Sequence, residues 1–185
     1  MNTLLVIDMQ NAWFDEAPRF DKPGVIERIN QAAACVRRDG GRVVYIRHCD
    51  GDAVPGSRAW QVIPELEVDA ADRHVDKLAC DSFAGTELLE QLAGSETLYI
   101  CGLATEFCVD TTLRAALSQG FDVVALSDAH TTGDRPHLSA RHVIEHHNWI
   151  WTHLAVPAGR RLAVQTVQDA VGRAERRRDD FRASP

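Results

Sequence analysis

The stretch TLYICGLATEFCVDTT, residues 97–112, predicts the part of the fold around which the rest is arranged. Residues 98–101 form a short apolar run, which is typical of a strand buried on both faces of a sheet. Gly102 ends this run, and apolar residues at helical spacing then continue toward Gly120, which is expected to cap the helix. The stretch therefore predicts a strand, a tight turn and a helix with Cys108 near its N-terminus.

The position of Cys108 gives it two possible roles. Unpaired backbone N–H groups and the helix dipole favour negative charge at a helix N-terminus. Both effects would lower the pKa of the Cys108 thiol and help to hold an oxyanion. The alternative is a structural role, because free cysteine is among the most buried residue types. Only the rest of the chain can separate these two interpretations.

Strand and helix patterns alternate along the whole chain. Further short apolar runs predict strands over residues 3–7, 43–47, 74–76, 121–126 and 162–165. Helices are expected over residues 23–38, from Thr86 to 92, over about 136–147, and from Thr166 to 178. The segments 8–14, 49–64 and 127–136 are expected to be loops. This alternation predicts one α/β domain over residues 1–185, with three αβα layers around a mostly parallel, Rossmann-like sheet of five to six strands.

Three polar side chains follow the predicted strands closely. Asp8, His48 and Lys77 each lie at or just after a strand end, and Cys108 follows a strand by a tight turn. Because the carboxyl ends of parallel strands meet at one edge of the sheet, these residues are expected to converge there. An acid, a lysine and a thiol can act together in catalysis, since a carboxylate can take the thiol proton and a lysine stabilises both anions. The set predicts acyl transfer from an amide to water.

Composition excludes several classes of function. The net charge of -7 argues against nucleic acid as a partner, and no apolar run is long enough to span a membrane. The five cysteines show no CxxC spacing, and no signal peptide is visible at the N-terminus. We therefore expect a cytoplasmic protein with reduced thiols.

The order of the motifs resembles the isochorismatase-like cysteine hydrolases over nearly the whole chain. The matching elements are DMQ at 8–10 followed by an aromatic residue, a lysine followed by SFAGT at 82–86, GLATEFCV at 102–109, and FDVVALSDAHTT at 121–132. The resemblance implies Asp8 as general base and acid, Lys77 as its ion partner and Cys108 as nucleophile. It also implies a cis peptide between Leu103 and Ala104, with the N–H groups of Ala104 and Cys108 forming an oxyanion hole.

The departures from the family pattern refine this expectation. Nicotinamidases of this group carry a metal site with an Asp-x-His after the second strand, whereas this chain has HCDGDAVPGSRAW there. We therefore expect neither a metal nor another cofactor, and nicotinamide is a weak substrate candidate. True isochorismatases usually lack the nucleophilic cysteine, so Cys108 favours cleavage of a C–N bond in a small amide or ureide.

Other functions stay open at this point. Carbamoyl cleavage to ammonia and carbon dioxide is a close alternative, and a non-catalytic binding or scaffold protein of the same fold is another. A nucleotide-binding protein is disfavoured because no glycine-rich loop follows the first strand, and a redox protein because no resolving cysteine is present at CxxC spacing.

Five residues are predicted to contact a small-molecule substrate, and two tryptophans to contact another subunit. The substrate-binding candidates are Gln10, Trp13, Trp60, Phe83 and Thr105. The alternative is that the aromatic residues are core and that Gln10 braces its loop. The resemblance implies a homodimer or homotetramer, and the place of Trp149 and Trp151 near a histidine-rich helix makes them our candidates for interface anchors. The nearby His142, His146 and His147 are expected on a helix surface or at that interface rather than around a metal.

Overall fold

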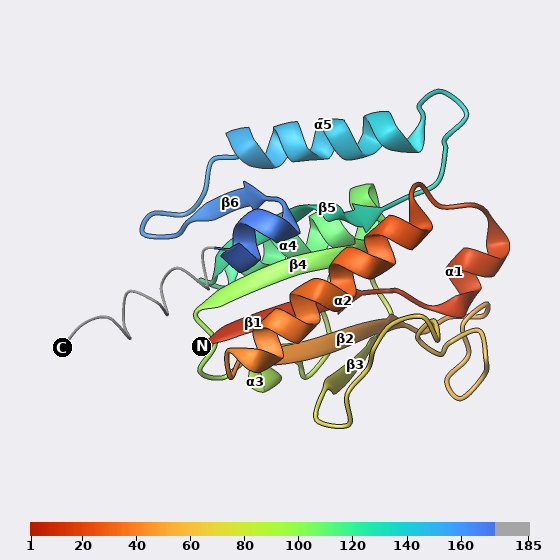
Figure 1. Cartoon of the computed structure of the whole chain (residues 1–185), viewed down its shortest axis with the longest axis horizontal. Coiled ribbons are helices and arrows are strands. Elements are labelled where there is room, and N and C mark those ends of the chain that lie inside the picture. The colour runs from red at the N-terminus through yellow and green to blue at the C-terminus, as the bar shows by residue number, and fades with distance from the viewer. Residues whose placement is uncertain (173–185) are drawn as a thin grey trace.

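The computed structural model describes residues 1–172 and contains a parallel sheet in the order β3-β2-β1-β4-β5-β6 (Figure 1). The strands are β1 (Asn2–Ile7), β2 (Arg42–His48), β3 (Arg73–Lys77), β4 (Thr97–Leu103), β5 (Asp122–Thr131) and β6 (Leu162–Gln165). The chain moves outward from β1 to β3 and then returns to the other side of β1 with β4. Ligands of such sheets bind at the carboxyl ends of the strands, beside this reversal.

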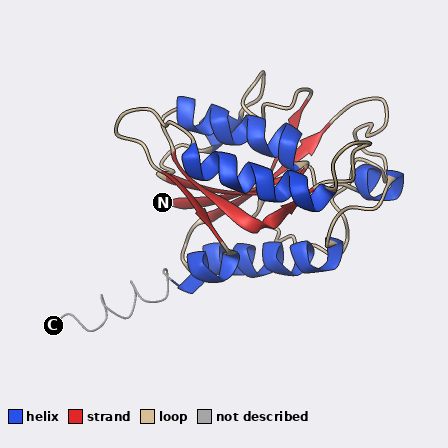
Figure 2. Ribbon diagram, turned by 90° about the horizontal axis from the view of Figure 1, so that it is seen from above, coloured by secondary structure: helices blue, strands red, loops and turns tan. Residues whose placement is uncertain are grey.

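Helices cover both faces of the sheet (Figure 2). They are α1 (Asn11–Glu16), α2 (Lys22–Arg38), α3 (Leu88–Gln91), α4 (Asp110–Ser118) and α5 (Ala140–His153), with a π-helical turn, η1 (Thr105–Val109), leading directly into α4. One core cluster joins α2 to its face of the sheet, and a second joins α3, α4 and α5 to the other face. The predicted three-layer α/β fold with a parallel sheet is confirmed.

The central strand explains why its sequence is a continuous apolar run. Leu4 and Val6 belong to the core under α2, whereas Leu5 and Ile7 belong to the core under α4, and all four are fully buried. A strand covered on both faces needs apolar residues at every position. The strand therefore ends where the first charged residue, Asp8, appears.

Several predicted boundaries were wrong, and polar residues are the reason in each case. Residues 8–14 were expected to be a loop, but α1 begins at Asn11, whose amide nitrogen donates to the Arg58 and Gln61 carbonyls. Strand β5 continues through the mostly polar residues 127–131, where the His130 ring bonds to the Thr105 hydroxyl and the Ser127 carbonyl accepts from Asn148. Helix α5 starts at Ala140 rather than near Pro136, because the Ser139 side chain caps it.

The last predicted helix is described only in part. Asp169 donates its N–H to the Thr166 hydroxyl at 3.1 Å, as expected of a helix cap, and residues 167–172 are helical. The remainder of the helix predicted to reach 178 lies outside the described residues. Within residues 1–172, no helix has both the length and the apolar character that crossing a membrane requires. All five cysteines are free thiols.

Candidate active site

Asp8, Lys77 and Cys108 meet in a buried cluster at the carboxyl edge of the sheet. The Lys77 Nζ donates to Asp8 Oδ2 at 2.8 Å and to Cys108 Sγ at 3.1 Å. Their exposed fractions are 3% for Asp8, 1% for Lys77 and 9% for Cys108. Asp8 follows β1, Lys77 ends β3 and Cys108 lies in η1 after β4, so the ends of three strands bring the set together. The sequence predicted this convergence.

The backbone around Asp8 is fixed by its neighbours. Asp8 has a left-handed backbone with φ 50°, which is uncommon for residues other than glycine but is tolerated by aspartate. Its N–H donates to the Ile46 carbonyl at 2.9 Å, and its carbonyl accepts from the Gln10 N–H at 2.9 Å. These bonds turn the chain sharply away from β1 and hold the carboxylate at the end of the strand.

Gly102 allows β1 and β4 to lie close together just before the site. Its φ is +116°, and a Cβ at this position would meet the Ile7 carbonyl oxygen and lie 2.6 Å from the Ile7 nitrogen. Only glycine combines this backbone with such a close approach. Leu103, the residue after Gly102, forms a cis peptide with Ala104, as the resemblance implied.

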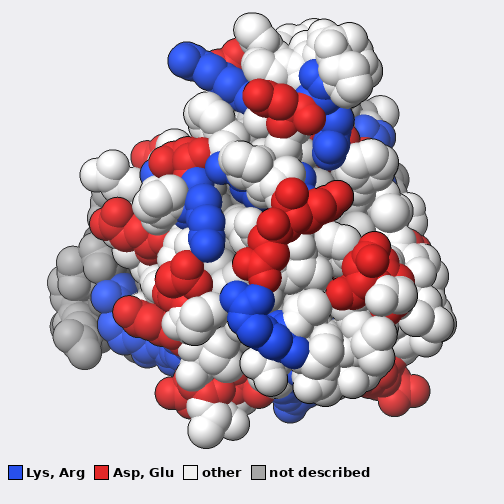
Figure 3. Space-filling model, turned by 90° about the vertical axis from the view of Figure 1, so that its right-hand side faces the viewer, with Lys and Arg blue, Asp and Glu red and all other residues white. Residues whose placement is uncertain are grey.

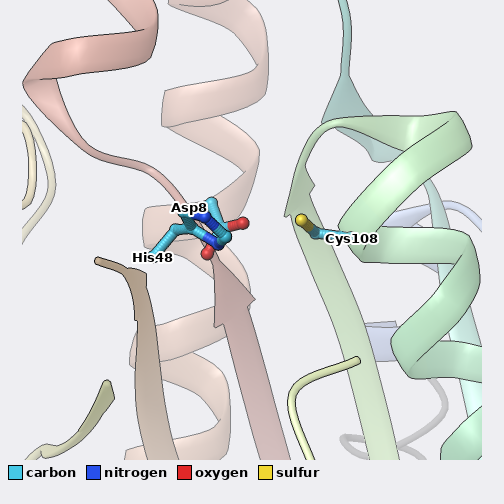
Figure 4. Close-up of side chains that lie close together, drawn as sticks. All are labelled: Asp8, His48 and Cys108. Carbon is cyan, nitrogen blue, oxygen red and sulfur yellow. The ribbon is translucent and has the colours of Figure 1, made fainter. Parts of the chain in front are cut away.

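His48 is a fourth member of the cluster, as its predicted place among the strand ends implied, although no role in the chemistry was predicted for it. Its Nδ1 lies 3.2 Å from Lys77 Nζ, and its Nε2 lies 3.4 Å from Asp50 Oδ2. Figure 4 shows His48 beside Asp8, with the Cys108 sulfur pointing toward both from the start of its helix. His48 is the last residue of β2, and its place at a strand end is the signal from which its convergence with Asp8 was predicted.

The donor set of the cluster fits an ammonium better than a metal ion. Ligand atoms of Asp8, His48 and Cys108 lie within 4.8 Å of one another, a spacing that can hold a metal. The Lys77 Nζ, however, lies within hydrogen-bonding distance of all three and also donates to the Ala79 carbonyl at 3.0 Å. A metal ion would have to displace this ammonium, whose pKa Asp8 and Cys108 raise against the effect of burial.

The pKa of the Cys108 thiol is raised, and not lowered as its position at a helix N-terminus suggested. Burial raises the pKa of the Cys108 thiol, the Asp8 carboxylate raises it further, and Lys77 offsets only part of this. Burial likewise raises the pKa of Asp8 above its usual value, against the opposing effect of Lys77. The expected lowering of the Cys108 pKa is therefore corrected, because desolvation and a neighbouring carboxylate outweigh the helix terminus. The cluster carries one negative charge more easily than two.

A cavity of about 310 Å³ opens beside Cys108. Its lining includes Asp8, His48 and Cys108 of the cluster, but not Lys77, and a wider wall of apolar and charged side chains: Trp13, Glu16, Arg19, Cys80, Leu103, Ala104, Phe107 and Arg135. Of the five residues predicted to contact substrate, Trp13 lies in this wall. Phe107, which lies next to Cys108 in η1, also lines the wall. Arg19 and Arg135 were not predicted, because they come from loops whose relative positions the sequence pattern does not show.

The other predicted contacts have structural partners instead. Gln10 is fully buried, and its side chain donates to the His48 and Trp60 carbonyls and accepts from the His48 N–H, so it braces the loop. Trp60 lies under the Arg47 guanidinium at 3.7 Å, and Phe83 stacks on Phe121 at 6.3 Å. These three side chains lie outside the cavity lining, as does Thr105.

Thr105 belongs to a second buried polar cluster on the other side of η1. Its hydroxyl lies 2.8 Å from His130 Nδ1, His130 Nε2 lies 3.1 Å from Asn148 Oδ1, and Asn148 donates to the Ser127 carbonyl. Burial lowers the pKa of His130 to about 4, so the imidazole is neutral. The chain of bonds links β5 and α5 to the turn that carries Cys108.

The two tryptophans of α5 differ in exposure. Trp151 is 1% exposed, and its Nε1 donates to Asp110 Oδ1 at 2.7 Å, which ties α5 to α4. Its predicted role as an interface anchor is therefore wrong, because it is buried in the core of its own chain. Trp149 is 60% exposed and stacks on His153.

Known proteins share this fold and about a third of the aligned sequence. The sequence profile of the isochorismatase domain matches residues 2–155. A streptothricin hydrolase of Streptomyces noursei is 34% identical over 145 residues, which are 74% of this chain and 51% of that protein. A ureidoacrylate amidohydrolase of Methylorubrum extorquens is 30% identical over 168 residues, 68% of each chain. The crystal structure of an isochorismatase family protein superposes with a TM-score of 0.80 at 32% identity, covering 89% of this chain and 98% of that one. The chain thus spans about half the length of the streptothricin hydrolase that it matches.

Proposed function

Because the chain belongs to the isochorismatase-domain family, we propose that it hydrolyses a C–N bond of a small amide or ureide through a thioester on Cys108. The observation that carries this proposal is the buried Lys77 ammonium, which bonds to both Asp8 and Cys108. The ureidoacrylate amidohydrolase among the relatives acts on a ureide, which supports the substrate class. A cavity of about 310 Å³ suits a small molecule.

The first half of the reaction begins with a proton transfer inside the cluster. Asp8 Oδ1 is buried and accepts no hydrogen bond from the described residues, so it can take the Cys108 proton. The thiolate attacks the carbonyl carbon, and the N–H groups of Ala104 and Cys108 hold the oxyanion. Asp8 then returns the proton to the leaving nitrogen, which departs as ammonia or an amine and leaves an acyl group on sulfur.

The second half regenerates the thiol. Water attacks the thioester carbon while Asp8 accepts one of its protons, and the carboxylic acid leaves as the C–S bond breaks. The proton returns from Asp8 to the Cys108 sulfur. The sum of the two halves is the amide plus water giving the acid plus ammonia or amine.

Lys77 makes the proton transfer possible at neutral pH. With the charge on Asp8 or on Cys108, the cluster holds the same single negative charge, and Lys77 bonds to either carrier. Burial penalises both carriers, which is why the pKa values of Asp8 and Cys108 are both raised. Moving the proton from Cys108 to Asp8 therefore moves the negative charge to the sulfur without adding a second one. Lys77 stabilises the charge on either atom.

Ammonia release from a panel of small amides and ureides tests this proposal. Wild type is expected to turn over at least one compound, and Cys108→Ala and Asp8→Asn are expected to lose on the order of 10⁴-fold or more in kcat. Asparagine keeps the size of Asp8 and accepts its left-handed backbone. Cys35→Ala, which removes a buried cysteine outside the cavity lining, is the matched control and should stay active.

Two further readouts sharpen the result. Mass spectrometry of a rapidly quenched reaction should show the acyl group on the Cys108 peptide, and its absence in an active enzyme would contradict the thioester. Chelator treatment should leave turnover unchanged, whereas lost turnover would mean that a metal replaces Lys77 in the chemistry. With ureides, bicarbonate as a product would identify carbamoyl cleavage instead of amide cleavage.

A further inference from the structure

Two arginines line the cavity that contains Cys108, although the proposed bond cleavage needs neither. Arg19 lies between α1 and α2, and Arg135 follows β5. Their segments are joined directly, since the Phe20 N–H donates to the Thr132 carbonyl at 3.0 Å and the Thr131 hydroxyl donates to the Phe20 carbonyl at 2.7 Å. Both guanidinium groups thus belong to one connected part of the cavity wall.

Arg19 is held in place by bonds that leave part of its guanidinium free. Its Nε donates to the Trp13 carbonyl at 2.7 Å, and its Nη2 donates to Glu16 Oε2 at 2.8 Å. Its Nη1 packs against Gly133, which has no side chain to displace it. Nη1 donates no hydrogen bond to any residue between 1 and 172, so at least two N–H groups are available to a ligand.

The charge of Arg19 is only partly cancelled by its acid. The Arg19 side chain is 9% exposed, whereas that of Glu16 is 67% exposed. Water therefore screens the carboxylate more than the guanidinium, so Glu16, which also lines the cavity, cancels the charge of Arg19 only in part. Because acidic and basic side chains are interspersed over the face seen in Figure 3, the charge of Arg19 acts locally and not as part of a basic surface.

The charge of Arg135 is cancelled more fully by its acid than that of Arg19 is. It pairs with Glu106 at 2.5 Å, where the acid is 16% exposed, and its Nη2 also donates to the Thr132 hydroxyl at 3.0 Å. Its guanidinium lies 5.3 Å from the centre of the Phe107 ring, which orients it at the wall. Arg135 is therefore the weaker of the two anion ligands, with donors but little unbalanced charge.

We propose that the substrate carries a carboxylate that binds to Arg19, with Arg135 beside it, while its scissile carbonyl lies at Cys108. A guanidinium binds a carboxylate through two parallel N–H···O bonds. The apolar side chains of Trp13, Leu103 and Phe107 contact the part of the molecule in between. The substrate class is thus the amide or ureide of a small carboxylic acid. This inference rests on the proposed use of Cys108 as the nucleophile.

The test compares alkylation of Cys108 by iodoacetate and by iodoacetamide, two reagents that differ in a carboxylate. The ratio of their rates at the Cys108 peptide, measured by mass spectrometry and divided by the same ratio for N-acetylcysteine, is independent of the thiolate fraction. Wild type is expected to prefer iodoacetate. Arg19→Gln is expected to lower the ratio on the order of tenfold, because a charged hydrogen-bond partner is lost, and Arg135→Gln is expected to lower it less.

Glu16→Gln separates anion binding from a structural role of the ion pair. Arg19→Gln and Glu16→Gln break the same pair, so a structural role predicts that both shift the ratio in the same direction. Anion binding predicts opposite directions, because removing Glu16 leaves the positive charge of Arg19 unbalanced. Arg19→Lys, which keeps the charge but loses the planar fork, should lie between wild type and Arg19→Gln. Arg141→Gln removes an arginine that is 71% exposed on α5 and should leave the ratio unchanged.

Kinetics with the monoamide of succinic acid and with butanamide complete the test. Arg19→Gln should raise KM for the anionic amide more than for the neutral one. Equal KM changes, or shifts of the alkylation ratio in the same direction for Arg19→Gln and Glu16→Gln, would overturn the inference. Alkylation needs only the thiol, so opposite shifts without any amide turnover would support the anion site and refute the proposed function. Amide turnover that Arg19→Gln leaves unchanged would support the proposed function and refute the anion site.

Discussion

Two buried polar clusters lie on either side of the π-helical turn η1, and they are built differently. The cluster of Asp8, Lys77, His48 and Cys108 contains full charges, and its Asp8 Oδ1 is buried without a hydrogen bond among the described residues. The cluster of Thr105, His130 and Asn148 is neutral, and each of its side chains has a partner. Each cluster has a buried centre, Asp8 and Lys77 in one and Thr105 and His130 in the other, so burial alone does not distinguish them.

The difference lies in how donors and acceptors are matched. A satisfied buried network is rigid, whereas an unpartnered buried oxygen is costly and is retained where a proton has to move. The neutral cluster therefore holds η1 against β5 and α5, and the charged cluster changes its protonation during the proposed reaction. Three variants test this contrast, from the largest expected effect to the smallest.

Lys77→Met should have the largest effect, because it leaves the Asp8 charge buried without its ion partner. The free energy of unfolding is expected to fall by about 3–5 kcal/mol, with loss of any hydrolytic activity. Burial raises the pKa of Asp8 in the folded protein, so the loss should shrink as pH falls and the carboxyl becomes neutral. Urea unfolding at several pH values measures both effects.

Lys22→Met is the control for Lys77→Met. Lys22 pairs with Glu65 at 3.0 Å, but both side chains are well exposed, so this change should cost less than about 1 kcal/mol. Equal losses in the two variants would mean that the charged cluster contributes no more than a surface pair, and the contrast between the clusters would disappear.

Gly102→Ala should disturb the charged cluster through the backbone. The added Cβ meets Ile7, the residue before Asp8, and requires a left-handed alanine. Together these effects are expected to cost about 2–4 kcal/mol and to separate Asp8 from Cys108, which lowers activity. Gly94→Ala has a similar positive φ but open space around it, so it should show only the backbone cost. Identical urea midpoints for the two variants would refute the close approach of β1 and β4.

His130 should produce a smaller, pH-dependent effect in the neutral cluster. Burial lowers its pKa to about 4 in the folded protein, so between pH 7 and 5 the unfolded chain binds the proton and the folded chain does not. Wild type should therefore lose about 2 kcal/mol more than His130→Gln over this range. Unfolding free energies at the two pH values measure the difference, with His137→Gln as a control for removing an exposed imidazole. The same pH dependence in wild type and His130→Gln would show that His130 is not held neutral.

The sequence allowed the charged cluster to be predicted better than its surroundings. Asp8, Lys77 and Cys108 follow strands whose apolar runs are easy to recognise, and parallel strands bring their ends to one edge of the sheet. The direction of the Cys108 pKa shift could not be predicted, because it depends on burial and on the distance to Asp8. The sequence indicated that Cys108 lies at a helix N-terminus near charged residues, but it did not show how far the thiol is removed from water.

The neutral cluster and the cavity wall were harder to predict. Residues 127–131 are mostly polar and were expected to be a loop, yet His130 is buried in β5, where Thr105 and Asn148 supply its partners. Arg19 and Arg135 come from segments far apart in the sequence. Their meeting depends on bonds between Phe20 and Thr132, which no local pattern indicates.

The Lys77 ammonium has three hydrogens but four acceptors within 3.2 Å, so one acceptor is always left over. A thiolate sulfur competes for the third hydrogen better than a protonated or an acylated sulfur does. Under the proposed chemistry, Lys77 gives that hydrogen to Cys108 while the sulfur is a thiolate and can give it to His48 Nδ1 once the sulfur is acylated. His48 Nδ1 would then change its hydrogen bond to Lys77 within each turnover. The chemical shifts of the His48 imidazole, followed by NMR, would report this change.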